Sequence, residues 1–371
     1  MIIGINASAL TLEHKTGVEK YTEHIIRALI KRADKKHQFK LYSPIPLSGD
    51  FAAHQVVLKS HGLPWTQVRL SVELMRHRPD VFFQPSYMLP PVCPCPSVTT
   101  VHDIAWKHFP QGYSQDQTKK LHLAIDRIIK LKSTIIVPSI DTKKDLMHFF
   151  KINQNNINVI PEALVELPVG DINLHPNIAK MADRDIVLSV GRLEARKNTL
   201  TLVKAFRVLV KDHLKNSPTK PVLVLIGQAG FGADEIFAEV NKAKNDGIEI
   251  LVLNNVDDSA LSCWMSVAKM LVYPSLFEGF GLPILQAFAA KIPVITSKTS
   301  AMPEVGGGAV AYLNNPKDED ELAILINNLL FSNAKREILI DKGQTRLNDF
   351  SWEKAADQTL AVLLAAGTKN S

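Results

Sequence analysis

The apolar residues of this chain follow two alternating patterns. Short continuous apolar runs are followed by longer stretches in which apolar residues recur every three or four positions. The first such pair is the run Met1–Ser8 and the stretch Val18–Arg32, where Tyr21, Ile25 and Leu29 fall on one side. Continuous runs are typical of strands buried on both faces, and the longer period is that of an amphipathic helix. The pattern therefore predicts buried strands that alternate with helices.

This alternation occurs in two successive sets. The first set predicts strands at Met1–Ser8, Phe39–Ser43, Val56–Leu58, Val81–Phe83, Ser97–Val101, Thr134–Pro138 and Ile157–Ile160. The second predicts strands at Asp185–Ser189, Val222–Ile226, Ile248–Leu253, Met270–Tyr273, Pro293–Thr296 and Ala309–Leu313. Alternating strands and helices predict an α/β chain with two doubly wound, Rossmann-like domains. Ligands of such sheets bind outside the carboxyl ends of the strands, so we expect them in a cleft that the domains face.

The domain boundaries follow from where the alternation stops. Residues 166–183 include Pro168, Gly170 and Pro176 and show little periodicity, so we assign them to a linker. We expect the first domain at 1–165, the second at 184–345 and a C-terminal helical region at 346–371. The last helix, Ser351–Ala366, has Ser351 as its N-cap and no strand after it. We therefore expect it to pack back on the first domain.

Composition places the chain among soluble globular proteins. Of 371 residues, 46% are hydrophobic and 22% are charged, and no apolar run approaches the length of a membrane span. The N-terminus lacks the pattern of a signal peptide, and three cysteines agree with a reducing compartment. Cys93 and Cys95 have the wrong spacing for a redox pair or a usual zinc site, so we interpret them as part of a loop. We expect a cytoplasmic protein.

The positive charge is concentrated in the first half of the chain. Residues 1–170 carry 21 Lys and Arg against 14 Asp and Glu, whereas the rest carries 22 against 23. A basic first half could face an anionic membrane or a phosphate-bearing substrate, and a solvated basic surface is the simpler interpretation. We expect peripheral contact with the inner leaflet of a membrane at most, and no nucleic-acid partner.

The segment 273–290 has the features of an anion site. A buried strand leads into a loop that holds Glu278, and the loop turns at Gly281 into a helix that opens with Pro283. Glycine lets the backbone approach a ligand closely, and the free N–H groups of a helix N-terminus attract negative charge. Glu278 beside this positive end is suited to accept hydrogen bonds from neutral hydroxyl groups.

Two further loops at strand ends carry candidate ligand-binding residues. Arg192 and Lys197 follow the first strand of the second domain, where a guanidinium and an ammonium could together hold a pyrophosphate. His102 closes a strand of the first domain, and Gly17 lies in the first loop. Each residue also has a purely structural interpretation. The sequence has no Walker motif, no nucleophile elbow and no His and Cys cluster at metal spacing.

Together these segments resemble a known enzyme family. Gly191-Arg192 with Arg196-Lys197-Asn198, the loop Pro274–Pro283, Val101-His-Asp103 and Pro303-Glu-Val305 are similar to motifs of retaining glycosyltransferases of family 4, the glycosyl transferases of group 1. The resemblance spans nearly the whole chain and implies the GT-B fold. It is closest in character to mannosyltransferases and is not specific for one sugar.

The resemblance also implies roles for individual residues. Arg192 and Lys197 would neutralise the donor diphosphate, so no metal and no other cofactor is expected. Glu278 would contact hydroxyls of the donor sugar, and His102 would lie by the reacting side of that sugar. The remaining expected donor-binding residues are Gly17, Phe280, Gly281, Leu282 and Gln286.

One position departs from the family pattern. The family places a second Glu eight residues after the first, and here that position is Gln286. The family Glu accepts hydrogen bonds from the donor ribose, so a Gln should weaken nucleotide binding by about 1 kcal/mol without abolishing it.

These implications lead to one main hypothesis and three alternatives. The main hypothesis is a glycosyltransferase that moves a hexose, such as mannose from GDP-mannose, to a glycan or lipid-linked acceptor in cell-surface polysaccharide synthesis. The nearest alternative is a UDP-hexose donor. A second is a catalytically weak sugar-nucleotide-binding subunit that scaffolds another enzyme, and a third is a membrane-surface binding protein. The acceptor, the linkage and the oligomeric state cannot be read from the sequence.

Overall fold

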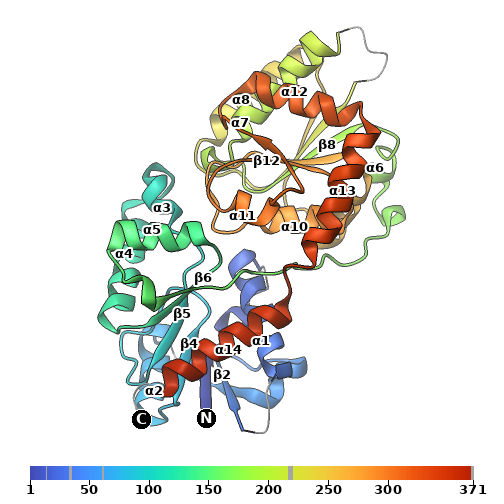
Figure 1. Ribbon diagram of the computed structural model, residues 1–371. Coiled ribbons are helices and arrows are strands. Elements are labelled where there is room, and N and C mark those ends of the chain that lie inside the picture. The colour runs from blue at the N-terminus through green and yellow to red at the C-terminus, as the bar shows by residue number, and fades with distance from the viewer. Residues whose placement is uncertain (14, 33–35, 61, 216–219, 369–371) are drawn as a thin grey trace. The chain divides into compact units, whose positions relative to one another are not determined.

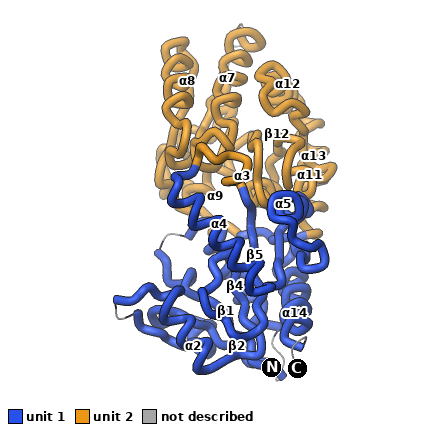
Figure 2. Tube along the Cα trace, turned by 90° about the vertical axis from the view of Figure 1, so that its left-hand side faces the viewer, with its two compact units in different colours: residues 1–104, 113–165, 350–371 blue, residues 105–112, 166–349 orange. Residues whose placement is uncertain are grey.

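The computed structural model describes residues 1–13, 15–32, 36–60, 62–215 and 220–368. The chain forms two compact units, which Figures 1 and 2 show. Unit 1 holds residues 1–104, 113–165 and 350–371, and unit 2 holds residues 105–112 and 166–349. Each unit is a parallel sheet with helices packed on it, which is the predicted α/β class. Residues 369–371 of the expected C-terminal region lie outside the described residues.

The sheet of unit 1 has seven parallel strands. They are β1 (Ile2–Asn6), β2 (Gln38–Ser43), β3 (Gln55–Val57), β4 (Val81–Gln84), β5 (Ser97–Thr100), β6 (Thr134–Val137) and β7 (Ile157–Val159). Their spatial order is β3-β2-β1-β4-β5-β6-β7. In the register Ile3 pairs with Phe39 on one side and Val81 on the other, so β1 and β4 are neighbours although two strands separate them in sequence. The strand order therefore reverses between β1 and β4, which makes this the switch point of unit 1.

Helices of unit 1 bury the apolar residues that the sequence pattern predicts. In α1 (Gly17–Arg32), Tyr21, Ile25 and Leu29 are buried in the core with strand residues such as Ile5. The other helices of this unit are α2 (Leu70–Arg76), α4 (Gln115–Lys130), α5 (Ile140–Phe150) and α14 (Trp352–Thr368). Ser114 starts α4 with a reciprocal cap in which its hydroxyl accepts from the Gln117 N–H and the Gln117 side chain accepts from the Ser114 N–H.

The C-terminal helix α14 packs on unit 1, which confirms the prediction. It lies beside α1 and β4, as Figure 1 shows in red and blue. The indole of Trp352 donates a hydrogen bond of 2.8 Å to the carbonyl of Leu164. The hydroxyl of Ser351 accepts from the Lys354 N–H at 3.1 Å, as an N-cap does. This helix therefore contributes apolar residues to the first core although residues 166–349 of unit 2 separate it from the rest of unit 1 in the sequence.

The sheet of unit 2 repeats the same design with six parallel strands. They are β8 (Ile186–Val190), β9 (Val222–Ile226), β10 (Ile250–Leu253), β11 (Met270–Tyr273), β12 (Val294–Ser297) and β13 (Ala311–Leu313), in the order β10-β9-β8-β11-β12-β13. Leu188 of β8 pairs with Val224 of β9 and with Leu271 of β11. The switch point of this unit therefore lies between β8 and β11.

Four described helices of unit 2 were not predicted from the sequence pattern. The helices are α3 (Ala105–His108), α6 (Pro176–Ala179), α7 (Thr199–Val208), α8 (Ala233–Asn245), α9 (Asp258–Val267), α10 (Leu282–Ala289), α11 (Met302–Gly306), α12 (Glu319–Leu330) and α13 (Asn333–Leu347). Three of the unpredicted helices, α3, α6 and α11, have only four or five residues each. The fourth is α13, in which only Gly343 is buried. A helix that is polar on nearly every side lacks the apolar stripe that the sequence reading depends on.

Within the described ranges, no helix combines the length and the apolar character needed to cross a bilayer.

Candidate functional site

Two loops converge at the switch point of unit 2. The loop 191–198 follows β8 and the loop 274–281 follows β11. Because β8 and β11 are neighbouring parallel strands, both loops leave the same carboxyl edge of the sheet. These are the two segments that the sequence marks as candidate anion-binding loops.

Backbone conformation fixes the first loop. Gly191 has a φ of 140°, which side-chain-bearing residues rarely adopt, and its N–H donates to the Ile226 carbonyl at 2.9 Å. Residues 195–197 form a single helical turn, and Asn198 ends it in the left-handed conformation. The Asn198 side chain donates to the carbonyl of Pro274 at 3.1 Å. Asn198 therefore ties the first loop to the second.

The carboxylate of Glu278 is the centre of a buried ion cluster. Its Oε1 accepts from the Lys197 ammonium at 2.5 Å and from the Tyr273 hydroxyl at 2.6 Å. Its Oε2 accepts from the Arg196 guanidinium at 3.0 Å. Glu278 is 7% exposed, so these contacts are made largely out of water. Charged groups in such a place are retained only when they are paired, and here each is paired.

The backbone of Glu278 is held as firmly as its side chain. Its N–H donates to the Ser300 hydroxyl at 3.1 Å, and that hydroxyl donates back to the Glu278 carbonyl at 2.6 Å. Arg196 also donates to the Phe277 carbonyl at 3.0 Å. The carboxylate is thus placed by contacts from three separate segments of unit 2.

The charges of this cluster shift the pKa values of its members. Burial by itself raises the pKa of Glu278, but the positive charges of Lys197 and Arg196 outweigh it and lower this pKa to about 2. Burial lowers the pKa of Lys197 despite the opposing attraction of Glu278. Burial and the Glu278 charge raise the pKa of the Tyr273 hydroxyl well above its ordinary value. At neutral pH the site therefore holds an ionised carboxylate beside a cation that burial makes easier to deprotonate.

Arg192 differs from Lys197 in its surroundings. Its side chain is 64% exposed, and its Nε lies 3.6 Å from a carboxylate oxygen of Glu194. Arg192 follows β8 as expected, but Arg196 is the guanidinium that contacts Glu278. The exposed position leaves Arg192 able to meet a ligand without breaking a buried ion pair.

The expected donor-binding residues of the second loop lie at the start of α10. Gly281 precedes this helix with a φ of 121°, Leu282 is its first residue, and Phe280 is buried. Gln286 is buried on the second turn of α10. The backbone N–H groups of the first turn point away from the helix, where they can receive an anion.

His102 belongs to unit 1 and lies at the carboxyl edge of its sheet. Its Nδ1 is 2.9 Å from a carboxylate oxygen of Glu162, and its Nε2 is 3.0 Å from the carbonyl of Pro85. Both partners are acceptors, an arrangement that favours the positively charged imidazole, in which both ring nitrogens donate. Burial lowers the pKa of His102, but Glu162 and the Pro85 carbonyl outweigh this and raise it above its ordinary value. The ring also contacts Tyr21 edge to face, with 4.6 Å between ring centroids.

Replacing Glu162 with Gln should therefore lower the pKa of His102. A raised folded-state pKa means that this pair stabilises the fold fully below the ordinary His pKa and that the contribution is lost as pH rises through the raised value. In Glu162→Gln the imidazole should titrate at least one pH unit lower than in the wild type, because a buried carboxylate contact is lost. NMR titration of the His102 ring protons measures this shift. An unchanged pKa would show that Glu162 does not stabilise the charged form of His102. His77, which is exposed and pairs with Glu73, serves as an internal control.

Gly17 is the first residue of α1, at the carboxyl edge of β1. The preceding Thr16 donates its N–H to the Glu19 carboxylate at 2.9 Å, and its hydroxyl also bonds to that carboxylate. The predicted site residues thus divide between the units. His102 and Gly17 are in unit 1, and Arg192, Lys197, Glu278 and the α10 residues are in unit 2.

Three partners in these clusters were given no role from the sequence. They are Glu162, Arg196 and Tyr273. Glu162 is the third residue after β7 and Tyr273 ends β11, so each lies at the carboxyl edge of its own sheet. A position at the carboxyl edge of a sheet was the signal that could have identified Glu162 and Tyr273. Among the described residues, no group of three or more His, Cys, Asp or Glu side chains is placed to hold a metal ion.

Two family models match the chain. Residues 15–164 match the model described as Glycosyltransferase Family 4, and residues 171–346 match the model described as Glycosyl transferases group 1. The chain belongs to the glycosyltransferases that these two models describe. The boundary between the two matches falls near the change from unit 1 to unit 2.

Curated relatives include mannosyltransferases. The O-antigen chain mannosyltransferase B of Escherichia coli is 28% identical over 268 residues, which cover 71% of this chain and 69% of that protein. The MMP alpha-(1->4)-mannosyltransferase of Mycolicibacterium hassiacum is 26% identical over 245 residues, 64% of this chain and 55% of that protein.

Solved structures share the whole architecture of this glycosyltransferase. Sucrose-phosphate synthase from Thermosynechococcus elongatus matches with a TM-score of 0.72 at 20% identity, covering 98% of this chain and 99% of that one. The Anabaena protein HepE, solved in complex with UDP-glucose, matches with a TM-score of 0.70 at 19% identity and the same coverage. These similarities establish the GT-B fold that the sequence motifs imply.

Proposed function

We propose that this glycosyltransferase transfers mannose from GDP-mannose, with retention of anomeric configuration, to a glycan or lipid-linked acceptor of a cell-surface polysaccharide. The observation that carries the proposal is the buried Glu278 carboxylate, held by Lys197 and Arg196 at the switch point of unit 2. A carboxylate there can accept hydrogen bonds from sugar hydroxyls, and the neighbouring cations can meet a diphosphate. The mannosyl assignment rests on the two mannosyltransferases described above.

The positive charges of this site suit a metal-free reaction. As the bond between the anomeric carbon and the diphosphate oxygen breaks, negative charge grows on the diphosphate. Arg192, Lys197 and the N–H groups at the start of α10 would stabilise that charge, which is electrostatic catalysis directed at the transition state. The departing oxygen would accept the proton of the incoming acceptor hydroxyl on the same face of the sugar. The reaction then needs no protein nucleophile.

The Lys197 ammonium is paired with the Glu278 carboxylate. Binding of a diphosphate would let the ammonium exchange one anionic partner for another without losing a counter-charge. Arg196 would keep Glu278 paired during this exchange, because it contacts the other carboxylate oxygen. We infer that Arg196 keeps the Glu278 carboxylate in place while the Lys197 ammonium moves to contact the donor diphosphate.

Donor specificity is tested by ligand-induced stabilisation. Purified protein in buffer with EDTA is heated alone or with GDP, UDP, ADP, GDP-mannose or UDP-glucose. A ligand present at about one hundred times its dissociation constant adds roughly 2.7 kcal/mol of stability, which raises the unfolding temperature measurably. We expect the guanine ligands to stabilise the protein and the others to have little effect. Stabilisation by UDP ligands instead would assign the donor to the UDP-hexose class, to which the ligand of HepE belongs.

Gln286 provides a graded test of nucleotide binding. A Gln offers one acceptor oxygen where the family has a charged carboxylate, so Gln286→Glu should bind the nucleotide more tightly, by about 1 kcal/mol or roughly fivefold. Calorimetric titration with GDP measures the change. An equal or weaker affinity would show that this position does not contact the ribose.

The scaffold hypothesis makes a different prediction for the same purified chain. A subunit that only binds sugar nucleotides would be stabilised by them and would release no free GDP from GDP-mannose. Release of GDP that stops in Lys197→Met would exclude this alternative. Peripheral membrane contact remains a proposal that rests on the basic first half of the chain, and vesicles of anionic lipid at low salt would bind the protein if it holds.

A further inference from the structure

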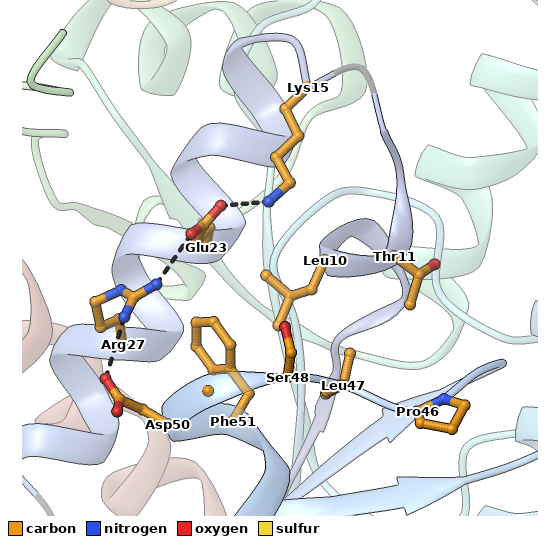
Figure 3. Close-up of a pocket in the computed structure, with 11 residues that line it drawn as sticks. Leu10, Thr11, Lys15, Glu23, Arg27, Pro46, Leu47, Ser48, Asp50 and Phe51 are labelled. Atoms are coloured by element: carbon orange, nitrogen blue, oxygen red, sulfur yellow. Dashed lines mark hydrogen bonds and ion pairs between the residues drawn. The ribbon is translucent and has the colours of Figure 1, made fainter. Parts of the chain in front are cut away.

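A polar pocket lies in unit 1, between the loop after β1, helix α1 and the segment after β2. Its volume is about 250 Å³, and Figure 3 shows the side chains around it. The loop after β1 contributes Leu10 and Lys15, α1 contributes Glu23 and Arg27, and the segment after β2 contributes Ser48 to Phe51. Because β1 and β2 are parallel neighbours, the pocket is at the carboxyl edge of the sheet, the edge at which ligands bind in doubly wound folds.

One wall of the pocket is a row of four alternating charges. The Lys15 ammonium is 2.5 Å from Glu23, Arg27 donates to Glu23 at 3.0 Å, and Arg27 also donates to Asp50 at 3.1 Å. The Arg27 guanidinium lies over the Phe51 ring, 4.8 Å from its centroid. These contacts favour one arrangement of the polar groups before any ligand arrives, which reduces the entropy cost of binding.

Beside the charged wall, the pocket has an apolar floor formed by Leu10, Leu47 and Phe51. Leu47 and Phe51 are buried members of the unit 1 core, and the Leu47 N–H donates to the Gln55 side chain at 2.8 Å. Leu10 packs against the same core. An apolar floor beside a row of polar groups is the usual composition of a small-molecule site.

The charges of the wall sum to zero, and this decides which ligand fits. Lys15 and Arg27 are balanced by Glu23 and Asp50, so a phosphate would gain two cations and be repelled by two carboxylates. Burial raises the pKa of Glu23, but Lys15 and Arg27 outweigh it and keep this carboxyl ionised at neutral pH. A neutral hydroxyl can instead donate to a carboxylate and accept from an ammonium or guanidinium at once.

The size of the pocket points to a single ring. Sites for larger ligands have volumes of about 300–1,000 Å³, and this pocket is smaller. A nucleotide would also need an accessible aromatic or apolar face for its base, whereas the Phe51 ring is buried and covered by Arg27. A sugar ring presents hydroxyls at its edge and C–H groups on its face, which matches the wall and the floor.

We propose that this pocket binds one uncharged sugar unit of the acceptor glycan. The proposal rests on the glycosyltransferase function proposed above and adds where and by which chemistry unit 1 recognises its acceptor. The row of four alternating charges would form hydrogen bonds with the sugar hydroxyls, and Leu10 and Leu47 would contact the ring face. A phosphate group or a lipid headgroup would be excluded by the two carboxylates.

Ligand-observed NMR can test the pocket directly, without turnover. Saturation transfer from the protein is measured for methyl α-mannoside, methyl β-glucoside, methyl α-galactoside and N-acetylglucosamine, each with GDP present to occupy the donor site. Two variants alter the pocket: Asp50→Ala removes one end of the row, and Ser48→Trp fills the space. Asp357→Ala is the matched control, because Asp357 forms an exposed ion pair with Arg32 in the same unit but lies outside the pocket.

We expect at least one of these sugars to bind the wild type and Asp357→Ala alike, and to bind Asp50→Ala about five- to tenfold more weakly, since a charged hydrogen-bond partner is lost. Ser48→Trp should abolish the signal. Absence of binding by all four sugars, equal binding by all variants, or competition by inorganic phosphate would overturn the proposal. The unfolding temperature with GDP is measured for every variant. If GDP stabilises neither the wild type nor any variant, the proposed donor chemistry is wrong. The sugar-binding result for the pocket stands in that case, because it does not depend on turnover.

Discussion

Lys197→Met should lower turnover by about two to three orders of magnitude and should also destabilise the protein. Turnover falls because the ammonium is one of the charges that meet the diphosphate in the transition state. Stability falls because removing one partner of a buried ion cluster leaves Glu278 without its closest cation, at a cost of about 3–5 kcal/mol. The rate of GDP release and chemical denaturation measure the two effects separately.

Two further variants separate these effects. Lys197→Met with Glu278→Gln removes the uncompensated charge, so it should recover part of the stability and none of the activity. Lys269→Met is the matched control, because Lys269 forms a similar ion pair with Asp185 at 2.5 Å in the same unit. Lys269 precedes β11 and Asp185 precedes β8, so this pair lies at the amino edge of the sheet, away from the site. The control should change stability by about 0–1 kcal/mol and leave turnover unaltered. Wild-type turnover in Lys197→Met would contradict the assignment of this lysine.

Arg192→Ala should lower turnover by about two orders of magnitude while leaving the fold intact. Its side chain is 64% exposed and makes one long contact, so its loss should change the free energy of unfolding by about 0.5 kcal/mol or less. Its effect on catalysis comes from the charge it brings to the diphosphate. Initial rates and denaturation curves of the same preparation measure both quantities.

Arg196→Ala is the informative comparison for Arg192→Ala. Arg196 contacts Glu194, the Phe277 carbonyl and Glu278, so its loss should destabilise the loop after β11 by about 2–3 kcal/mol. If Arg192→Ala were as destabilising as Arg196→Ala, the exposed arginine would have a structural role instead. If Arg192→Ala kept full activity, the diphosphate would be held without it.

The fold was predictable because both sheets are buried on two faces. Strands such as Val222–Ile226 are continuous apolar runs, and their spacing by amphipathic helices leaves few alternatives to a doubly wound fold. The helix α13 was missed for the opposite reason. It packs on α10 through Gly343, whose hydrogen faces the Phe288 ring at a place where a Cβ would come within 2.7 Å. A contact made by a missing side chain leaves no apolar pattern in the sequence.

The positions of the site residues were also predictable, but their partners were not. Lys197, Glu278 and His102 each follow a buried strand, and parallel strands bring such residues to one edge. Which carboxylate meets which cation depends on side-chain directions and loop geometry. Arg196 and Lys197 lie on the single helical turn that ends at Asn198, and no spacing rule predicts that these two adjacent cations share one carboxylate. For the same reason the pairing of His102 with Glu162, sixty residues later, appears only in the structure.

We propose that the cations of unit 2 hold the donor diphosphate without a metal. Calorimetric titration of GDP in buffer with EDTA tests it on the wild type, Lys197→Met, Arg192→Ala and Lys269→Met. We predict that the wild type and Lys269→Met bind GDP with equal affinity and that the other two variants bind at least about tenfold more weakly, since each loses a charged contact to phosphate. Equal affinity in all four proteins, or binding that requires an added divalent metal, would contradict the claim.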